Sequence, residues 1–178
     1  MREQIGDQLR VNWRYFPLEQ VNSAEGPEWK LWEQPDSHRS RGRPAFQAAT
    51  AARNQGDEAF DRFHIALLRA KHEDGKDHGR RQVLTKVAES AGLDMDRFQR
   101  DLVDRSSLPQ IGRDYEEARD RFGVFGTPTF VFPNDQAVYL KLLPAPPEAD
   151  TMTVFDDFVR SARDRPYLLE LKRPLRPE

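Results

Sequence analysis

Apolar residues in the middle of the chain recur at spacings of three and four, which is the period of an amphipathic helix. Gly56, Gly92 and Gly123 each follow an apolar stripe and are placed to end a helix. Asp94 is suited to cap the short segment that carries Phe98 and Leu102. The pattern therefore predicts a run of helices: from Pro44 to Gly56, from Asp57 to His72, around Val83 to Ala88, after Asp94, and from Leu108 towards Phe122.

Two other segments have the character of strands. Leu9–Tyr15 alternates apolar and polar residues, which predicts a half-buried strand, and residues 1–8 resemble the tail of a helix leading into it. Val124–Phe132 is rich in aromatic and β-branched residues and is followed by turn chemistry, so Ala137–Leu142 is expected to form its hairpin partner. A last amphipathic helix is predicted from Thr151 to Arg163.

A strand, a block of helices, a hairpin and a closing helix together predict an α/β sheet interrupted by a helical subdomain. Between Glu19 and Gly42 no periodicity persists, which indicates a long ordered loop with one helical turn near Trp29 and Trp32. These two tryptophans either contact a substrate or, as we favour, pack against the sheet.

Composition narrows the class of protein. The 178 residues include 28 Lys and Arg against 30 Asp and Glu, a net charge of -2, which disfavours a nucleic-acid binder. The start of the chain does not resemble a targeting signal, and no apolar run is long enough for a membrane span, so a cytoplasmic protein without a membrane partner is expected. There is no cysteine, and hence no disulfide, thiolate metal site or cysteine nucleophile.

Three polar segments are candidate sites. His72–His78 gathers five potential metal ligands, but it lacks the spacing of a known metal motif and is better interpreted as a solvated loop. His64 lies in a predicted helix, where a packed histidine is commoner than a catalytic one. The basic stretch His38–Arg43 could meet a phosphate or another anion, although a mobile charged loop explains it as well. Motifs of hydrolases and nucleotide-binding proteins are absent from the sequence.

The proline at the start of the second strand is the most specific feature. Pro128 cannot donate a ladder hydrogen bond, so it suits the first residue of a strand, an edge or a bulge. Spacing alone favours a trans bond at Thr127-Pro128, whereas a cis bond would leave the peptide groups of Gly126 and Thr127 facing outward, where an extended peptide could add a strand.

The order of these features resembles the DsbA-like thioredoxin-fold family, and most closely its FrnE-like branch. The resemblance rests on Val11–Leu18, on the helical stretch Phe63–Leu93, and above all on Gly123–Val131, which is similar to the cis-proline loop and third strand of the family. It implies a thioredoxin-like fold made of residues 1–42 and 107–178, with a helical insertion at 43–106. It also implies that Gly126, Thr127, Pro128 and Thr129 bind a peptide or small thiol substrate.

The sequence departs from the family at its reactive centre. In the family an initial strand and a Cys-x-x-Cys motif precede the region that matches Gln4–Leu18, and neither has a counterpart here. Thiolate attack on a disulfide needs a sulfur nucleophile, so dithiol exchange by this chain alone is not expected. We expect the first residue to be an internal start, with the strand and dithiol encoded upstream; a second chain or a rearranged helix could otherwise fill the gap, which leaves a homodimer open.

Two alternatives to a thiol-disulfide oxidoreductase stay open. Glutathione-dependent isomerases and transferases of the thioredoxin fold share this architecture, but their catalytic serine also falls in the segment without a counterpart. A peptide-binding module would keep the proline loop without catalysis. No catalytic residue, metal ligand or cofactor is assigned in any of the three interpretations, and the expected ligand is a peptide or a small thiol such as glutathione.

Overall fold

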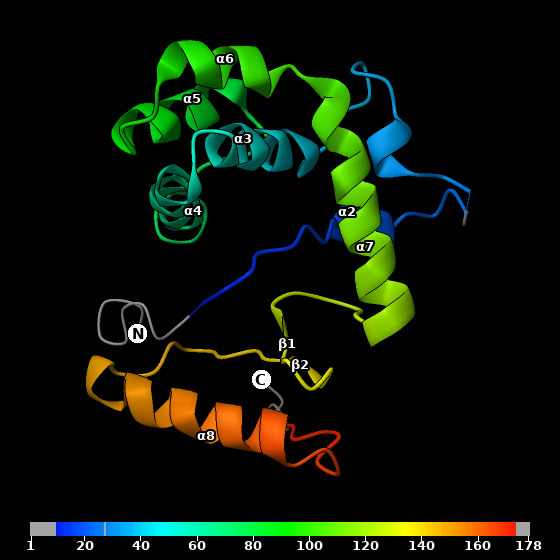
Figure 1. Ribbon diagram of the computed structural model, residues 1–178, viewed down its shortest axis with the longest axis vertical. Coiled ribbons are helices and arrows are strands. Elements are labelled where there is room, and N and C mark those ends of the chain that lie inside the picture. Colours follow the sequence, from blue (N-terminus) through cyan, green and yellow to red (C-terminus); the bar gives the residue numbers. More distant parts are fainter. Residues whose placement is uncertain (1–9, 27, 174–178) are drawn as a thin grey trace, which may run out of the picture. The chain divides into compact units, whose positions relative to one another are not determined.

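The computed structural model describes residues 10–26 and 28–173 (Figure 1). The chain forms two compact units: a helical unit, Arg14–Glu117, and a hairpin unit, which combines Met1–Trp13 with Ala118–Glu178. The predicted division into 1–42 with 107–178 and 43–106 sets its boundaries elsewhere, and that division stays a prediction. In the described part of the chain, no helix is both long and apolar enough to cross a membrane.

The helical unit confirms the helices expected from the apolar stripes. Pro44 lies in the first turn of α3, and Gly92 adopts a φ of 69° just after α5, as expected of a residue that ends a helix. A short helix, α2, lies in the segment predicted as loop, and the expected turn near the tryptophans is η2. The elements are α2 (Leu18–Val21), η2 (Leu31–Glu33), α3 (Arg43–Arg53), α4 (Asp57–His72), α5 (Arg81–Ser90), α6 (Met95–Leu102), η3 (Arg105–Ser107) and the start of α7 (Leu108–Phe122).

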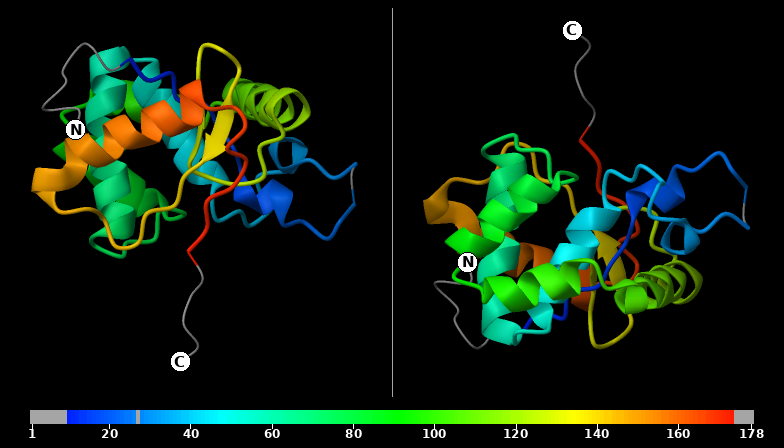
Figure 2. Two further views of the ribbon diagram at one scale, coloured as in Figure 1. Left: turned by 90° about the horizontal axis from the view of Figure 1, so that it is seen from below. Right: turned by 90° about the horizontal axis from the view of Figure 1, so that it is seen from above.

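The core of the helical unit is built around α3. This helix packs against α4, α5 and α6. Figure 1 shows the four helices together, and Figure 2 gives two further views of the chain. Five of its alanines are buried, and side chains this small let the neighbouring helices approach closely. Larger residues fill the space between the outer helices; Phe63 and Phe98 are fully buried, with ring centroids 5.8 Å apart.

The start of α6 is held in two ways. The Asp94 side chain accepts a hydrogen bond from the backbone N–H of Arg97, which confirms the predicted cap. Gln55, just beyond α3, donates to the backbone carbonyl of Asp94 at 2.9 Å and accepts from its N–H at 2.8 Å. The two helices are therefore joined where α6 begins.

The predicted strand Leu9–Tyr15 is wrong for the part that the structure describes, since residues 10–17 have no strand assignment. Leu9 and residues 1–8 lie outside the described residues. Alternation alone does not make a strand, because a strand needs a neighbour to accept its ladder hydrogen bonds. Val11 and Trp13 are exposed, whereas Tyr15 and Phe16 are buried by helices, with Phe16 against Tyr115 of α7.

The hairpin unit contains a two-stranded antiparallel sheet and one long helix. The predicted hairpin is confirmed, but its strands are shorter than expected: β1 (Thr129–Val131), β2 (Ala137–Tyr139), then η4 (Glu148–Asp150) and α8 (Thr151–Asp164). Phe130 lies opposite Val138 in the register. Phe158 of α8 packs against the rings of Phe130 and Phe132 at 5.0 and 6.0 Å, so three aromatic rings join the hairpin to the helix.

Candidate functional site

The loop that leads into β1 starts where α7 ends. Gly123 has a φ of 63°, a left-handed conformation that glycine adopts without steric cost, and this turn lets the N–H of Val124 bond to the carbonyl of Ala118 at 3.0 Å. Val124 is buried as a result. The next residue, Phe125, is 70% exposed, so the loop presents a large aromatic side chain directly before the predicted site.

The four predicted site residues, Gly126 to Thr129, form one tight turn. The hydroxyl of Thr129 donates to the carbonyl of Gly126 at 2.7 Å, and the carbonyl of Pro128 accepts from the N–H of Leu140 at 3.2 Å. Gly126 is buried, whereas Thr127 and Pro128 are exposed. The peptide bond between Thr127 and Pro128 is cis. The turn is thus fixed at both ends while its middle faces solvent.

β1 has a neighbour on one side only, because the sheet has two strands in the described part of the chain. The N–H of Phe132 donates to the carbonyl of Gln136 at 2.9 Å, and in an antiparallel ladder every second residue makes such bonds. Counting back from Phe132, the N–H and C=O groups of Thr129 and Val131 face away from β2. These groups define the outer edge of β1, which has no strand partner among the described residues.

Aromatic side chains lie beside the turn. The rings of Phe125 and Tyr139 are 5.3 Å apart, and a Cβ atom on Gly126 would lie 3.4 Å from the Tyr139 ring. The small residue at 126 therefore lets the ring of Tyr139 come close to the backbone. Several neighbouring residues of the hairpin unit are also exposed: Phe130, Val131, Leu142 and Leu143.

This arrangement supplies binding groups but no thiol. The turn offers backbone N–H and C=O groups, threonine hydroxyls and apolar surface, and the chain has no thiol at all. No group of three or more His, Cys, Asp or Glu residues that could hold a metal ion is found within residues 10–26 and 28–173. The chemistry available at the β1 edge is therefore main-chain pairing and apolar contact.

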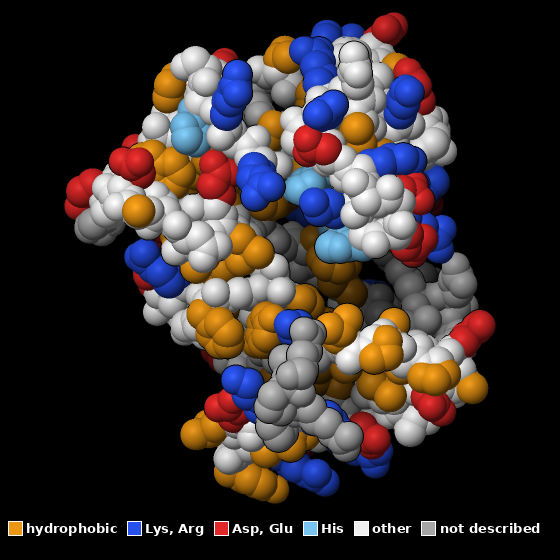
Figure 3. All heavy atoms as spheres, turned by 180° about the vertical axis from the view of Figure 1, so that it is seen from behind, with side chains coloured by type: hydrophobic (Ala, Val, Ile, Leu, Met, Phe, Trp, Pro, Cys, Tyr) orange, Lys and Arg blue, Asp and Glu red, His pale blue; other side chains and the backbone are white. Residues whose placement is uncertain are grey.

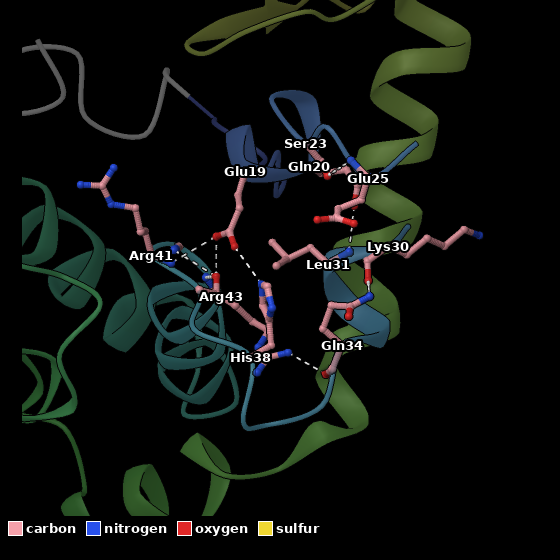
Figure 4. A network of polar contacts seen from close by, with 12 residues as sticks. Glu19, Gln20, Ser23, Glu25, Lys30, Leu31, Gln34, His38, Arg41 and Arg43 are labelled. Carbon is pink, nitrogen blue, oxygen red and sulfur yellow. Dashed lines mark hydrogen bonds and ion pairs between the residues drawn. The ribbon is translucent and has the colours of Figure 1, made fainter. Parts of the chain in front are cut away.

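The basic stretch His38–Arg43 is divided among separate roles. Glu19 accepts hydrogen bonds from His38 Nε2 at 3.2 Å, from the Ser40 hydroxyl at 2.6 Å and from the Arg41 N–H at 3.1 Å. Figure 4 shows Glu19 between His38 and Arg41. Burial alone would raise the pKa of Glu19, but these hydrogen bonds outweigh it and hold the pKa below its usual value. Glu19 thereby fixes the loop before α3.

The side chain of Arg43, in the same stretch, is buried. Its guanidinium donates to the carbonyls of Gln34 and Pro35 at 2.7 and 3.0 Å, and only 5% of the residue is exposed. Arg41 points its side chain away from Glu19 (Figure 4). The expectation of one mobile basic loop is therefore wrong for His38, Ser40 and Arg43, which are held in place, whereas Arg41 is left to contact other groups.

The remaining candidates have packing partners. His64 stacks on Phe60 with ring centroids 5.3 Å apart, as expected of a packed histidine. Trp29 lies 5.7 Å from the ring of His38, and Trp32 lies 5.6 Å from Tyr115 of α7. Trp32 thus packs against α7, whereas packing of the tryptophans against the sheet stays a prediction.

Asp114 was not among the residues singled out by the sequence. Its side chain is 2% exposed, and its carboxylate accepts hydrogen bonds from the backbone N–H of Tyr15, from Gln110 Nε2 at 2.6 Å and from Arg14 Nη1 at 3.3 Å. Its position does carry a signal, because it lies one turn from Ile111 on the buried side of an amphipathic helix. A carboxylate at such a position needs donors from elsewhere in the chain.

Comparisons with known proteins agree with this geometry. A family model described as DSBA-like thioredoxin domain matches residues 2–157. The chain belongs to this family, and its fold is of the α/β thioredoxin-like class.

Three similar proteins differ in how much of their own length the match covers. The Uncharacterized protein Rv2286c of Mycobacterium tuberculosis is 25% identical over 99% of this chain and 74% of its own length. The Na(+)/H(+) antiporter NhaA 3 of Salinispora tropica is 35% identical over 68% of this chain, but that match spans only 15% of the antiporter. The Na(+)/H(+) antiporter NhaA 1 of Salinispora arenicola is 33% identical over 73% of this chain and 16% of its own length.

Proposed function

We propose that this chain is a FrnE-like member of the thiol-disulfide oxidoreductase family and that it holds an extended peptide substrate at the turn Gly126–Thr129 and along the outer edge of β1. The observation that carries the proposal is the direction of the peptide groups of Thr129 and Val131, which face away from β2. An extended peptide can pair with such groups as an added strand. A cytoplasmic location belongs to the same proposal.

Side-chain chemistry around the edge suits a peptide with apolar residues. Phe125 and Tyr139 lie together beside the turn, and Phe130 and Val131 are partly exposed along β1. In strand addition the main chain supplies affinity and side-chain pockets supply selectivity. We therefore expect a preference for peptides in which aromatic or β-branched residues alternate with polar ones.

Catalysis of dithiol exchange is not proposed for this chain by itself. The reaction proceeds by attack of a thiolate on a disulfide sulfur, and the chain has no cysteine to supply the thiolate. We expect no turnover in an insulin reduction assay with dithiothreitol or glutathione as reductant, beyond the rate of the reductant alone. Turnover above that rate would overturn this part of the proposal.

Peptide binding is tested with two proline variants of the hairpin. Val131→Pro removes an N–H that faces outward from β1, and Ala137→Pro removes the equivalent outward N–H at the far edge of β2. We expect a fluorescent peptide with alternating valine and threonine residues to bind the wild type and the Ala137→Pro variant alike, and to lose about tenfold or more in affinity for Val131→Pro. Equal affinity in all three proteins, or equal loss in both variants, would contradict the proposed edge.

Glutathione is the competing ligand, because the tripeptide carries a short backbone that the same peptide groups can pair with. Calorimetric titration of glutathione and of the peptide into the same protein separates the two. Saturable heat with the peptide and none with glutathione supports a peptide-binding chain. Saturable heat with glutathione alone would instead favour the relationship to glutathione-dependent isomerases and transferases.

A further inference from the structure

A surface cavity of about 570 Å³ lies in the helical unit. It is formed where the loop before α3 meets the connection between α4 and α5. Its volume falls within the range of about 300 to 1,000 Å³ that is typical of small-molecule sites. The residues that line it are Ser40, Arg41, Lys71, Gly75, Lys76, Asp77, His78, Gly79 and Arg80.

The lining carries four cationic side chains and one carboxylate. Lys76 pairs with Asp74 at 2.7 Å, and Arg80 pairs with Asp77 at 3.2 Å. Arg41 and Lys71 form no ion pair with any of the described residues, so two full positive charges remain uncompensated at the cavity. On the face drawn in Figure 3, Lys, Arg and His side chains gather over the helical unit.

His78 adds a second, independent observation. Its Nδ1 atom is buried and has no hydrogen-bond partner among the described residues. Burial lowers the pKa of His78, and the charge of Lys71 lowers it further, against the opposing effect of Asp77 and with smaller contributions from His72 and Arg41. A buried nitrogen without a partner costs free energy, and an oxygen of a ligand would relieve that cost.

We propose that this cavity binds a small molecule that carries a di- or triphosphate group. Several negative charges close together match Arg41 and Lys71, and one phosphate oxygen would accept a hydrogen bond from His78 Nδ1–H. The lining includes no Phe, Tyr or Trp side chain, and the phosphate chain is the part that would be recognised.

The backbone around the cavity has two relevant features. A Cβ atom on Gly79 would lie 3.2 Å from the carbonyl oxygen of Arg41, which is tighter than most such contacts. The two segments that line the cavity are therefore in close contact. Arg80 directly precedes α5, a helix of 10 residues without a side-chain cap, whose N-terminal end adds partial positive charge.

The test is calorimetric titration of inorganic pyrophosphate and of inorganic triphosphate into the full chain, at about 0.15 M salt, which screens diffuse surface attraction. The variants are Arg41→Gln and Lys71→Gln. Lys86→Gln is the matched control, because Lys86 is an exposed cation of α5 that does not line the cavity. We expect saturable binding to the wild type and to Lys86→Gln, and a loss of about tenfold for each of the other two variants.

Nuclear magnetic resonance of the His78 imidazole, assigned with a His78→Gln variant, locates the ligand. Saturating pyrophosphate is expected to raise the pKa of His78 and to shift its ring signals, while the signals of His64 stay in place. Circular dichroism confirms that each variant is folded. Absence of saturable binding to the wild type, an equal loss in Lys86→Gln, or an unchanged His78 titration would each overturn the proposal.

Discussion

The carboxylate of Asp114 accepts a hydrogen bond of 3.0 Å from the backbone N–H of Tyr15, although the two residues are 99 positions apart. This bond attaches the extended segment before α2 to the buried side of α7. It accounts for how a segment without a strand partner is held in the helical unit. Asp114 therefore has two roles: it accepts a hydrogen bond from the main chain, and it forms an ion pair with Arg14.

Asp114→Asn tests which of those roles matters. The amide has the same shape but replaces one acceptor oxygen with a donor, so at least one of the donors around Asp114 loses its acceptor, and we expect a loss of about 1 to 3 kcal/mol in the free energy of unfolding. Arg14 is 53% exposed on its side chain, so Arg14→Gln should cost at most about 1 kcal/mol. Urea unfolding of both variants measures the difference. Equal losses in the two variants would assign the stabilisation to the ion pair instead.

Glu19 makes stability depend on pH. Since its pKa is lower in the folded chain than the ordinary value of 4.5, its contribution is fully present above about pH 4.5 and is lost as the pH falls through the folded pKa. Glu19→Gln lacks that contribution. We therefore expect the difference in unfolding free energy between wild type and Glu19→Gln to be constant near neutral pH and to shrink below pH 4.5. Urea unfolding across this range measures it, and a constant difference down to acid pH would contradict the assignment.

The helices could be predicted from the sequence because their signals are local. Asp94 lies next to the helix that it caps, and Gly92 follows the stripe that it ends. The strand Leu9–Tyr15 could not be judged in this way, because alternation describes one strand and a ladder needs two. The hairpin was predicted correctly because its second strand follows the first after a turn of a few residues.

For the candidate sites, too, features set by neighbouring residues could be predicted, whereas features set by residues distant in sequence could not. The turn around Pro128 was recognisable from a contiguous run of residues, and its geometry is set within the hairpin unit. The roles of Glu19 and Asp114 could not be predicted from the sequence, because they depend on hydrogen-bond donors that are distant in sequence. The sequence suggested that His38–Arg43 could meet an anion, but only the fold shows that Ser40 and Arg41 of this stretch line the same cavity as Lys71.

Gly112 is expected to resist substitution for a steric reason. A Cβ atom there would lie 2.6 Å from Cε2 and Nε1 of Trp32, whose ring is held against Tyr115. Gly112→Ala should therefore destabilise the helical unit by about 1 to 3 kcal/mol, even though alanine is the better helix former. Gly42→Ala is the control, because its Cβ would make an ordinary contact of 3.5 Å with Phe46. Thermal unfolding should show a clear loss for Gly112→Ala only; an unchanged or raised midpoint would contradict the close contact.

Phe158 is expected to hold the proposed peptide-binding edge in place, since its ring packs against Phe130 and Phe132 on either side of Val131. Phe158→Ala should remove about 1 to 3 kcal/mol from the local stability of the hairpin, because a partly buried ring is lost. Phe155→Ala, in the same helix but without a ring contact among the described residues, is the control. Hydrogen exchange of the Phe130 and Phe132 amides measures the effect. If both variants speed exchange equally, the stabilisation comes from α8 as a whole and not from the Phe158 ring.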